Sequence, residues 1–161
     1  MTGWVIYDKA GYRRNKWFAE KLTEELGKDC RLIIADHLHF GVDGGFFFYY
    51  MGERIKAPDY AVQRSIYPVL SDTLEGAGVR VFNSARVSRV CNDKRLTLLL
   101  GVSLGLACPR TTFADTAITE FNSFPCILKS AGGHGGQQVS MINSDMEYEE
   151  AIENFDSRDI L

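Results

Sequence analysis

Residues 125–142 decide the fold and read Pro125-Cys126-Ile127-Leu128-Lys129-Ser130-Ala131-Gly132-Gly133-His134-Gly135-Gly136-Gln137-Gln138-Val139-Ser140-Met141-Ile142. A short apolar run ends at Lys129, a glycine-rich stretch follows, and apolar residues then alternate with polar ones. This pattern predicts a strand, a glycine loop and a second strand.

The glycine loop is a candidate phosphate site. Glycine lets a backbone approach an anion closely because no Cβ intervenes, and unpaired N–H groups in such a loop cradle phosphate oxygens. Lys129 adds a mobile positive charge for the same oxygens. The residues therefore favour a nucleoside triphosphate as ligand. The alternative is an ordinary hairpin tip, where glycine is the usual turn residue.

Two better-known phosphate loops do not fit this stretch. A P-loop has its lysine after the glycines, followed by Ser or Thr, and it opens a helix. Here Lys129 precedes the glycines, and the residues after them are typical of a strand. The run Gly132–Gly136 also lacks the G-x-G-x-x-G spacing of a dinucleotide-binding turn. A glycine hairpin between two strands remains.

A second cation lies at the start of a predicted helix. One helical face would be formed by Leu96, Leu99, Leu100 and Leu104. Asn92 is expected to cap this helix and Gly105 to end it. Lys94 then lies in the first turn, where the helix dipole disfavours a cation by about 0.3–1 kcal/mol. A bound anion would remove that conflict; the alternative is an exposed lysine that tolerates it.

Together these motifs resemble the ATP-grasp superfamily of carboxylate–amine ligases, and most closely its RimK-like glutamate ligases. The matching blocks stand in the family's order: Phe82-Asn83, Asn92-Asp93-Lys94, Gly105-Leu106-Ala107-Cys108-Pro109-Arg110-Thr111, Pro125–Lys129, and the glycine loop ending in Val139. The resemblance implies an α/β fold. It places a pre-ATP-grasp, Rossmann-like parallel sheet in residues 1–83 and the first α+β subdomain of an ATP-grasp fold in residues 84–161.

The resemblance also implies roles for individual residues. The lysines match the two that contact ATP phosphates in the family, and the glycines match those that cover the phosphates. The implied ATP site comprises Lys94, Lys129, Gly132, Gly133, His134, Gly135 and Gly136. Many relatives have Pro, Ser and Gly where this chain has Ser130, His134 and Gln138. His134 either donates a hydrogen bond to a phosphate or lies in solvent at the loop tip.

The reaction implied by the resemblance activates a carboxylate with ATP and joins it to an amine. The partners would be ATP and a small-molecule or peptide carboxylate and amine, and no residue here is assigned as a nucleophile. The family's Mg²⁺ ligands would lie beyond Leu161, because residues 145–155 are expected to form the helix before the adenine hinge strand and residues 158–161 to begin that strand. We therefore expect the front part of a longer ligase, inactive alone. The alternatives are a non-catalytic nucleotide-binding or interaction module and, less well matched to the Asn92-Asp93-Lys94 block, an unrelated flavodoxin-like domain.

Composition excludes several classes of partner. The 161 residues carry a net charge of −3, without the basic excess typical of nucleic-acid binders. No apolar run reaches the roughly 18 residues of a membrane span, and the first residues do not resemble a secretory signal. We expect a cytoplasmic protein without nucleic-acid or membrane partners. The four cysteines form no C-x-x-C pair, which favours buried thiols over a metal site or disulfide.

The first 83 residues alternate between predicted strands and helices, which indicates a parallel sheet. Strands are expected at residues 4–7, 30–35, 46–50, 60–63 and 79–82, and helices begin after Asn15 and Ser65. A further strand is expected near Arg110–Phe113. Ligands of parallel sheets lie beyond the carboxyl ends of the strands.

Three other segments of the chain are candidates for function. Arg13 and Arg14, in a predicted loop after the first strand, either bind a substrate carboxylate or lie in solvent. Residues 36–43 hold two His and two Asp, so a metal site is conceivable, but an ordinary loop is preferred. The aromatic run 46–50 belongs to the core or to a subunit interface, which would suit a homo-oligomer. The acidic residues 147–153 are expected on a solvated helix face.

Overall fold

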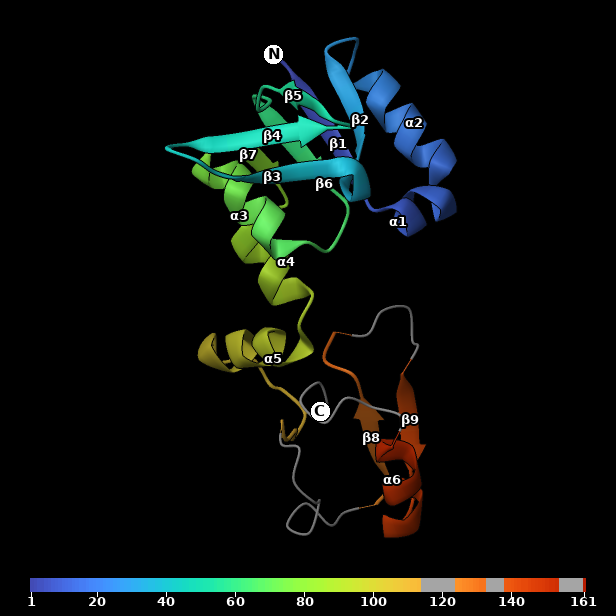
Figure 1. The fold of residues 1–161 in the computed structure, drawn as a ribbon. Helices are drawn as coiled ribbons and strands as arrows, with labels where there is room; N and C mark the ends of the chain where they lie inside the picture. Colours follow the sequence, from blue (N-terminus) through green and yellow to red (C-terminus); the bar gives the residue numbers. More distant parts are fainter. Residues whose placement is uncertain (114–123, 133–137, 154–160) are drawn as a thin grey trace. The chain divides into compact units, whose positions relative to one another are not determined.

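The protein is described by a computed structural model that covers residues 1–113, 124–132, 138–153 and 161. These residues divide into two compact units, Met1–Arg89 and Val90–Leu161. Figure 1 labels the helices and strands of both units, which are described separately below. The domain boundary that the sequence predicts at residues 83–84 stays a prediction.

The first unit is built on a four-stranded parallel sheet with the order β2-β1-β6-β7 (Figure 1). Its strands are β1 (Gly3–Tyr7), β2 (Cys30–Ile34), β6 (Tyr60–Gln63) and β7 (Arg80–Phe82). Every residue of β1 is buried, as expected for a central strand whose two faces are both covered. The predicted parallel sheet is therefore confirmed.

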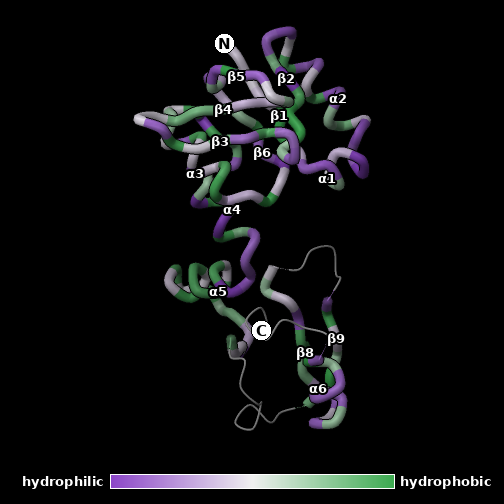
Figure 2. The backbone as a smooth tube through the Cα atoms, viewed as in Figure 1, coloured by the Kyte–Doolittle hydropathy of each residue, from purple (hydrophilic) through white to green (hydrophobic). Residues whose placement is uncertain are grey.

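Helices cover both faces of this sheet. Because side chains alternate along β1, Val5 and Tyr7 point to one face and Trp4 and Ile6 to the other. The first pair packs with Ala19 of α2 (Lys16–Glu25), and the second with residues of α3 (Pro68–Gly76). Figure 2 shows apolar residues, in green, along the central strand β1. The resulting two-sided core fixes the carboxyl edge of the sheet.

A second sheet, of three antiparallel strands, lies beside this core. It has the order β3-β4-β5, with β3 (Leu38–Val42), β4 (Phe46–Tyr50) and β5 (Glu53–Ile55). Two predictions were wrong here: the aromatic run forms β4 outside the parallel sheet, and residues 36–43 are not a loop. They form the 3₁₀ turn η1 (Ala35–His37) and β3, because β3 pairs along its whole length with β4. Phe48 of β4 is buried and its ring lies edge-on to Trp4, with 5.6 Å between centroids.

The segment after β1 is a short helix rather than the predicted loop. Helix α1 (Lys9–Arg14) begins at Asp8, whose carboxylate accepts a hydrogen bond from the Gly11 N–H at 2.6 Å. Such side-chain capping satisfies a donor that has no partner within the helix. Asn15 precedes α2 as predicted, but its side chain makes no capping bond and donates to the Gly11 carbonyl instead.

Helix α3 also begins later than its predicted cap. The sequence placed Ser65 at the N-cap, whereas the helix starts at Pro68 after Tyr67. Proline is favoured in the first helical turn because its missing N–H is not needed there. Ser65 is buried instead, with 6% of its surface exposed.

The second unit contains a β-hairpin and two helices that are described. These are α5 (Lys94–Ser103), β8 (Cys126–Lys129), β9 (Val139–Ile142) and α6 (Asp145–Ile152), while α4 (Ala85–Cys91) spans the division between the units. β8 and β9 pair antiparallel, with Lys129 opposite Val139, which confirms the predicted strand–glycine–strand arrangement. Leu128, Ile142 and Tyr148 form the core between the hairpin and α6.

Two further predictions for this unit concern the strand expected near residues 110–113 and the end of the last helix. Residues 110–113 form no strand, because no described segment pairs with them there. Helix α6 ends at Ile152, and the residues 154 and 155 that were predicted to continue it lie outside the described part of the chain. Within the described residues, no helix combines the length and the apolar character needed to cross a membrane.

The cysteines are free thiols, but not all of them are buried as predicted. Cys30 is buried in the core, Cys108 and Cys126 are partly exposed, and Cys91 is exposed near the end of α4. Burial raises the pKa of the Cys126 thiol above its usual value.

Candidate functional site

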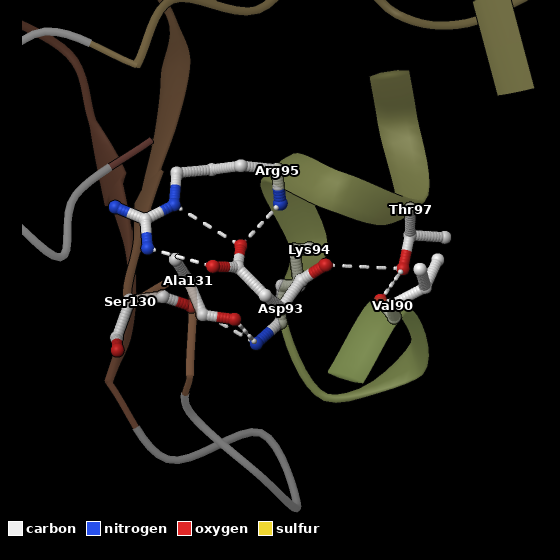
Figure 3. A network of polar contacts seen from close by, with 7 residues as sticks. All are labelled: Val90, Asp93, Lys94, Arg95, Thr97, Ser130 and Ala131. Carbon is white, nitrogen blue, oxygen red and sulfur yellow. Dashed lines mark hydrogen bonds and ion pairs between the residues drawn. The ribbon is translucent and has the colours of Figure 1, made fainter. Parts of the chain in front are cut away.

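The candidate site begins at the N-terminus of α5, which Figure 3 shows from close by. Asp93, not the predicted Asn92, is the N-cap: its carboxylate accepts a hydrogen bond from the Arg95 N–H at 2.8 Å. Its extended backbone (φ −122°, ψ 114°) suits that position, since the cap residue lies just outside the helix. Lys94 is therefore the first residue of the helix.

The guanidinium of Arg95 closes onto the same carboxylate. Its Nη2 lies 2.7 Å from Oδ2 of Asp93, and its Nε lies 3.0 Å from Oδ1. Hydrogen bonds from Arg95 hold the pKa of Asp93 below its usual range, although partial burial opposes that shift. The two side chains thus form a bidentate pair that orders the first turn of α5.

Lys94 reaches from this turn to the end of β8. Its Nζ donates to the carbonyl oxygens of Ser130 at 2.9 Å and Ala131 at 3.2 Å, and its main-chain N–H donates to the Ala131 carbonyl at 3.0 Å. Ser130 is 3% exposed and Ala131 fully buried. The helix start is therefore joined to the residues that lead into the glycine loop, as Figure 3 shows.

Lys129 is the last residue of β8 and is half-buried. Its main chain exchanges two 3.0 Å hydrogen bonds with Leu161, the pattern of a directly opposed antiparallel pair. Because strand side chains alternate, Lys129 points away from the α6 side, where its neighbour Leu128 is buried. The Lys129 ammonium is in neither a hydrogen bond nor an ion pair with the described residues.

The ends of the glycine loop are paired to each other. The Ser130 N–H donates to the Gln138 carbonyl at 3.1 Å, and Gln138 has a positive φ of 58°. Left-handed backbone is unfavourable for residues with a side chain, which gives a physical reason for glycine to suit this position. Gly132 is exposed, whereas the predicted site residues Gly133, His134, Gly135 and Gly136 lie outside the described residues.

Arg13 and Arg14 occupy the last turn of α1, and both are exposed. Cations at a helix C-terminus are favoured by the helix dipole, so their place has a structural reason independent of any substrate. Near them, the Lys9 N–H donates to the Asp36 carboxylate at 2.7 Å, which links the carboxyl ends of β1 and β2. Among the described residues, no three His, Cys, Asp or Glu side chains come together as a metal site.

Sequence reasoning found the two lysines but missed several of the groups around Lys94. The pairing of Asp93 with Arg95 could have been predicted from the sequence, because a cap residue and a cation two residues later can pair at a helix start. The contact of Lys94 with the carbonyl oxygens of Ser130 and Ala131 could not have been predicted in this way, since every residue has such an oxygen.

The sequence has a curated relative, although no family model matches the chain. Glutamate–LysW ligase ArgX from Sulfurisphaera tokodaii is 34% identical over 99 residues, which cover 58% of this chain and 34% of that protein. The match therefore spans about a third of the length of the relative.

Solved structures share the fold along nearly the whole chain. A RimK domain ATP-grasp protein from Sphaerobacter thermophilus has a TM-score of 0.66 at 18% identity, covering 96% of this chain and 58% of that one. The ATP-grasp ligase PsnB, solved with a precursor peptide and AMPPNP, has a TM-score of 0.61 at 18% identity, covering 99% and 63%. The VanG D-Ala:D-Ser ligase of Enterococcus faecalis has a TM-score of 0.66 at 15% identity, covering 94% and 58%. At such identities the likeness shows the fold alone, which is that of the ATP-grasp ligases. The partial sequence match to a glutamate–LysW ligase agrees with the predicted resemblance to RimK-like ligases.

Proposed function

We propose that this chain is the front part of an ATP-dependent ligase that joins a carboxylate to an amine, and that it is inactive alone. One observation carries the proposal: Lys94 and Lys129 lie in the first turn of α5 and at the end of β8, and Lys94 contacts the two residues that follow Lys129. Two lysines around a glycine-rich hairpin suit a polyphosphate.

The proposed phosphate site combines charge with main-chain donors. Lys129 supplies an ammonium without a hydrogen bond or ion pair to the described residues, and the exposed Gly132 begins the glycine-rich segment. Phosphoryl transfer depends mainly on positioning and on neutralising charge, which is the work that such groups perform. The glycines after Gly132 keep their sequence-based assignment.

The proposed reaction has two steps. A carboxylate oxygen of the substrate attacks the γ-phosphorus of ATP, the bond to the β-phosphate oxygen breaks, and ADP leaves. An amine nitrogen then attacks the acyl carbon, inorganic phosphate leaves, and the nitrogen loses a proton. Lys94 and Lys129 would hold and neutralise the phosphates, and no side chain of the protein forms a covalent bond to substrate.

Magnesium enters this proposal only as an implied companion of ATP. The described residues contain no cluster of three acidic, His or Cys side chains, so they do not supply a magnesium site. No step is therefore assigned to a metal through these residues. The predicted ligands beyond Leu161 stay a prediction.

The substrate class rests on the relatives and on one pair of arginines. The name of one similar protein mentions glutamate and LysW, and the description of another mentions a precursor peptide. We propose by analogy that glutamate and a peptide or small molecule are joined here, with Arg13 and Arg14 as candidates for holding a carboxylate. The cytoplasmic location and a homo-oligomeric state stay predictions.

The experiment measures ADP formation from ATP and Mg²⁺ with glutamate and a panel of amines and peptides. Because this chain is expected to be inactive alone, the assay uses the longer ligase that contains it. That ligase should form ADP only when both a carboxylate and an amine are present, and Lys129→Ala should abolish ADP formation. The matched control is Lys56→Ala, which removes an exposed lysine of the first unit. Full activity of Lys129→Ala would contradict the proposed site. ATP binding without any turnover would favour the non-catalytic nucleotide-binding alternative.

A further inference from the structure

Lys94 makes three hydrogen bonds to two consecutive main-chain carbonyls, which is more than a phosphate contact requires. We infer that Lys94, in addition to the phosphate contact proposed above, is a positioning residue: it fixes the main chain at Ser130 and Ala131, from which the glycine-rich segment continues. The effect on nucleotide affinity rests on the proposed function, whereas the positioning itself does not.

The geometry supports this role through both ends of the residue. The Lys94 N–H, in the first turn of α5, has no partner within the helix, and the Ala131 carbonyl accepts from it at 3.0 Å. The side-chain ammonium of the same residue donates to that carbonyl at 3.2 Å and to the Ser130 carbonyl at 2.9 Å. Because both the main-chain N–H and the ammonium of Lys94 bind this segment, they fix the orientation of the main chain at Ser130 and Ala131. A single hydrogen bond would fix only its distance.

The other side of the same segment is also held. The Ser130 N–H donates to the carbonyl of Gln138, the residue before β9. Ser130 is therefore bonded through its N–H to the hairpin and through its carbonyl to Lys94. Ser130 and Ala131 are both buried, so their carbonyls depend on such internal donors. A cationic donor makes stronger hydrogen bonds than a neutral one. Loss of the Lys94 ammonium would therefore leave a buried carbonyl at Ser130 without this donor.

Lys129 provides a matched comparison within the same hairpin. Its side chain makes no hydrogen bond or ion pair to the described residues, and its main chain pairs with Leu161 whatever the side chain is. A residue that only contacts phosphate should leave the ligand-free structure unchanged when it is replaced. Lys129 is expected to behave in that way, and Lys94 is not.

Amide hydrogen exchange of the nucleotide-free protein separates the two cases, because it reports local opening. In Lys94→Met, the amides of residue 94 and of Ser130 should exchange about tenfold faster or more, since charge-assisted bonds are lost. In Lys129→Met, both rates should match the wild type. Lys94→Arg should recover most of the protection, because a guanidinium can also donate to two carbonyls.

Unchanged exchange at both amides in folded Lys94→Met would overturn the inference. Slow exchange in helix α6, which packs on the hairpin core of the same unit as Lys94, serves as the check that this unit is folded. If Lys94→Met does not fold, Lys94→Gln replaces it in the test. The shorter glutamine side chain can make at most part of the contact with the Ser130 and Ala131 carbonyls, so the Ser130 amide should again exchange faster than in the wild type.

ATP titration of the same variants separates this inference from the proposed function. If Lys94 acts by position, Lys94→Arg should restore ATP affinity together with amide protection. If the wild-type protein binds no ATP, the proposed function is contradicted. The exchange experiment still tests the positioning role of Lys94, because it is made without nucleotide.

Discussion

Asp93 shows how one residue organises the candidate site. Its carboxylate caps α5 and binds the Arg95 guanidinium in two places, so the first turn is set before any ligand arrives. Lys94 follows directly, and its direction toward Ser130 depends on where that turn begins. The site therefore depends on a residue that contacts no substrate in the proposed mechanism.

Replacement of Asp93 should destabilise the second unit. Asp93→Ala removes both the cap and the ion pair and should cost about 1–2 kcal/mol of unfolding free energy. Asp93→Asn is the matched control, because Asn is also a good N-cap and removes only the charge. It should cost less, about 1 kcal/mol or below, since it keeps the cap and loses only an ion pair that is partly exposed. Urea denaturation followed by far-ultraviolet circular dichroism measures both; equal losses would mean that the cap contributes nothing.

The charge of Asp93 also predicts a pH dependence. Its pKa in the folded protein lies below the ordinary value because Arg95 bonds the ionised form. A lowered pKa stabilises the fold above the unfolded-state pKa of about 4, and that stabilisation disappears as pH falls through the folded-state pKa. The stability difference between wild type and Asp93→Asn should thus be constant from pH 5 to 8, as an order-of-magnitude window, and shrink below about pH 4. A difference that grows toward low pH would contradict this assignment.

At the residue scale, the sequence predicted where Lys94 and Lys129 lie in the fold, but it did not predict which groups contact them. Lys94 and Lys129 were identified from their places beside a helix start and a glycine run. The N-cap was misplaced by one residue, because Asn92 and Asp93 are both good caps and only the backbone decides between them. The acceptors of Lys94 are main-chain oxygens, which no side-chain pattern indicates.

Secondary-structure elements that carry a clear periodicity were predicted well. Strand β1, helix α6 and the β8–β9 hairpin follow their apolar patterns. Helix α5 lies where its leucine spacing predicted a helix, although Leu99, Leu100 and Leu104 of the predicted apolar face are exposed. The antiparallel sheet was missed because β5 has only three residues and the polar side chains around β3 obscured its alternation of Leu38, Phe40 and Val42. Helix α1 was missed because six residues including a glycine give too little pattern.

The β4–β5 hairpin carries a turn that its sequence does not favour. Met51 and Gly52 form the two-residue connection, with φ of 52° and 86°, between the paired residues Tyr50 and Glu53. A turn with positive φ at both positions favours Asn-Gly, and Met is a poor choice at the first. The Met51 side chain is 73% exposed, so it contributes little packing.

Replacement of Met51 should therefore stabilise the first unit. Met51→Asn should raise its unfolding free energy by about 0.5–1 kcal/mol, because Asn tolerates left-handed backbone. Met51→Val is the control and should lower it, since a β-branched side chain is least compatible with positive φ. Denaturation followed by tryptophan fluorescence measures both. A gain in Met51→Val as large as in Met51→Asn would show that loss of an exposed apolar side chain, not backbone strain, is responsible.

The whole molecule is made of two compact units, each with its own apolar core. Both tryptophans lie in the first unit: Trp4 is 3% exposed and Trp17 is 76% exposed. Trp17→Phe would leave Trp4 as a reporter of the first core alone. Units with separate cores are expected to unfold separately unless a large apolar interface joins them.

The stability of the two units should accordingly respond to different substitutions. In a Trp17→Phe background, Asp93→Ala should leave the denaturation midpoint reported by Trp4 unchanged and shift only the part of the circular dichroism signal that comes from the second unit. A shift of the Trp4 midpoint by the same amount would show that the two units unfold as one.

At the scale of the molecule, the order of motifs allowed the fold to be recognised. No single block identified it, but a glycine hairpin after a lysine-bearing helix start, preceded by a strand–helix alternation, fits the ATP-grasp fold that the solved structures share. The carboxylate and amine could not be predicted in the same way, because no pattern in the chain specifies them. Arg13 and Arg14 show the difficulty, since their place at a helix C-terminus already has a structural reason.

Equilibrium binding of ATP to the wild-type protein and to Lys129→Ala, with Lys56→Ala as the control, tests the candidate site before any catalytic assay. Calorimetry should show the same affinity for wild type and Lys56→Ala, and an affinity about tenfold lower or worse for Lys129→Ala, because a hydrogen bond to a charged group contributes about 1.5–3 kcal/mol. Equal affinity in all three proteins, or no binding by the wild type, would contradict the assignment of the β8 end as an ATP phosphate site.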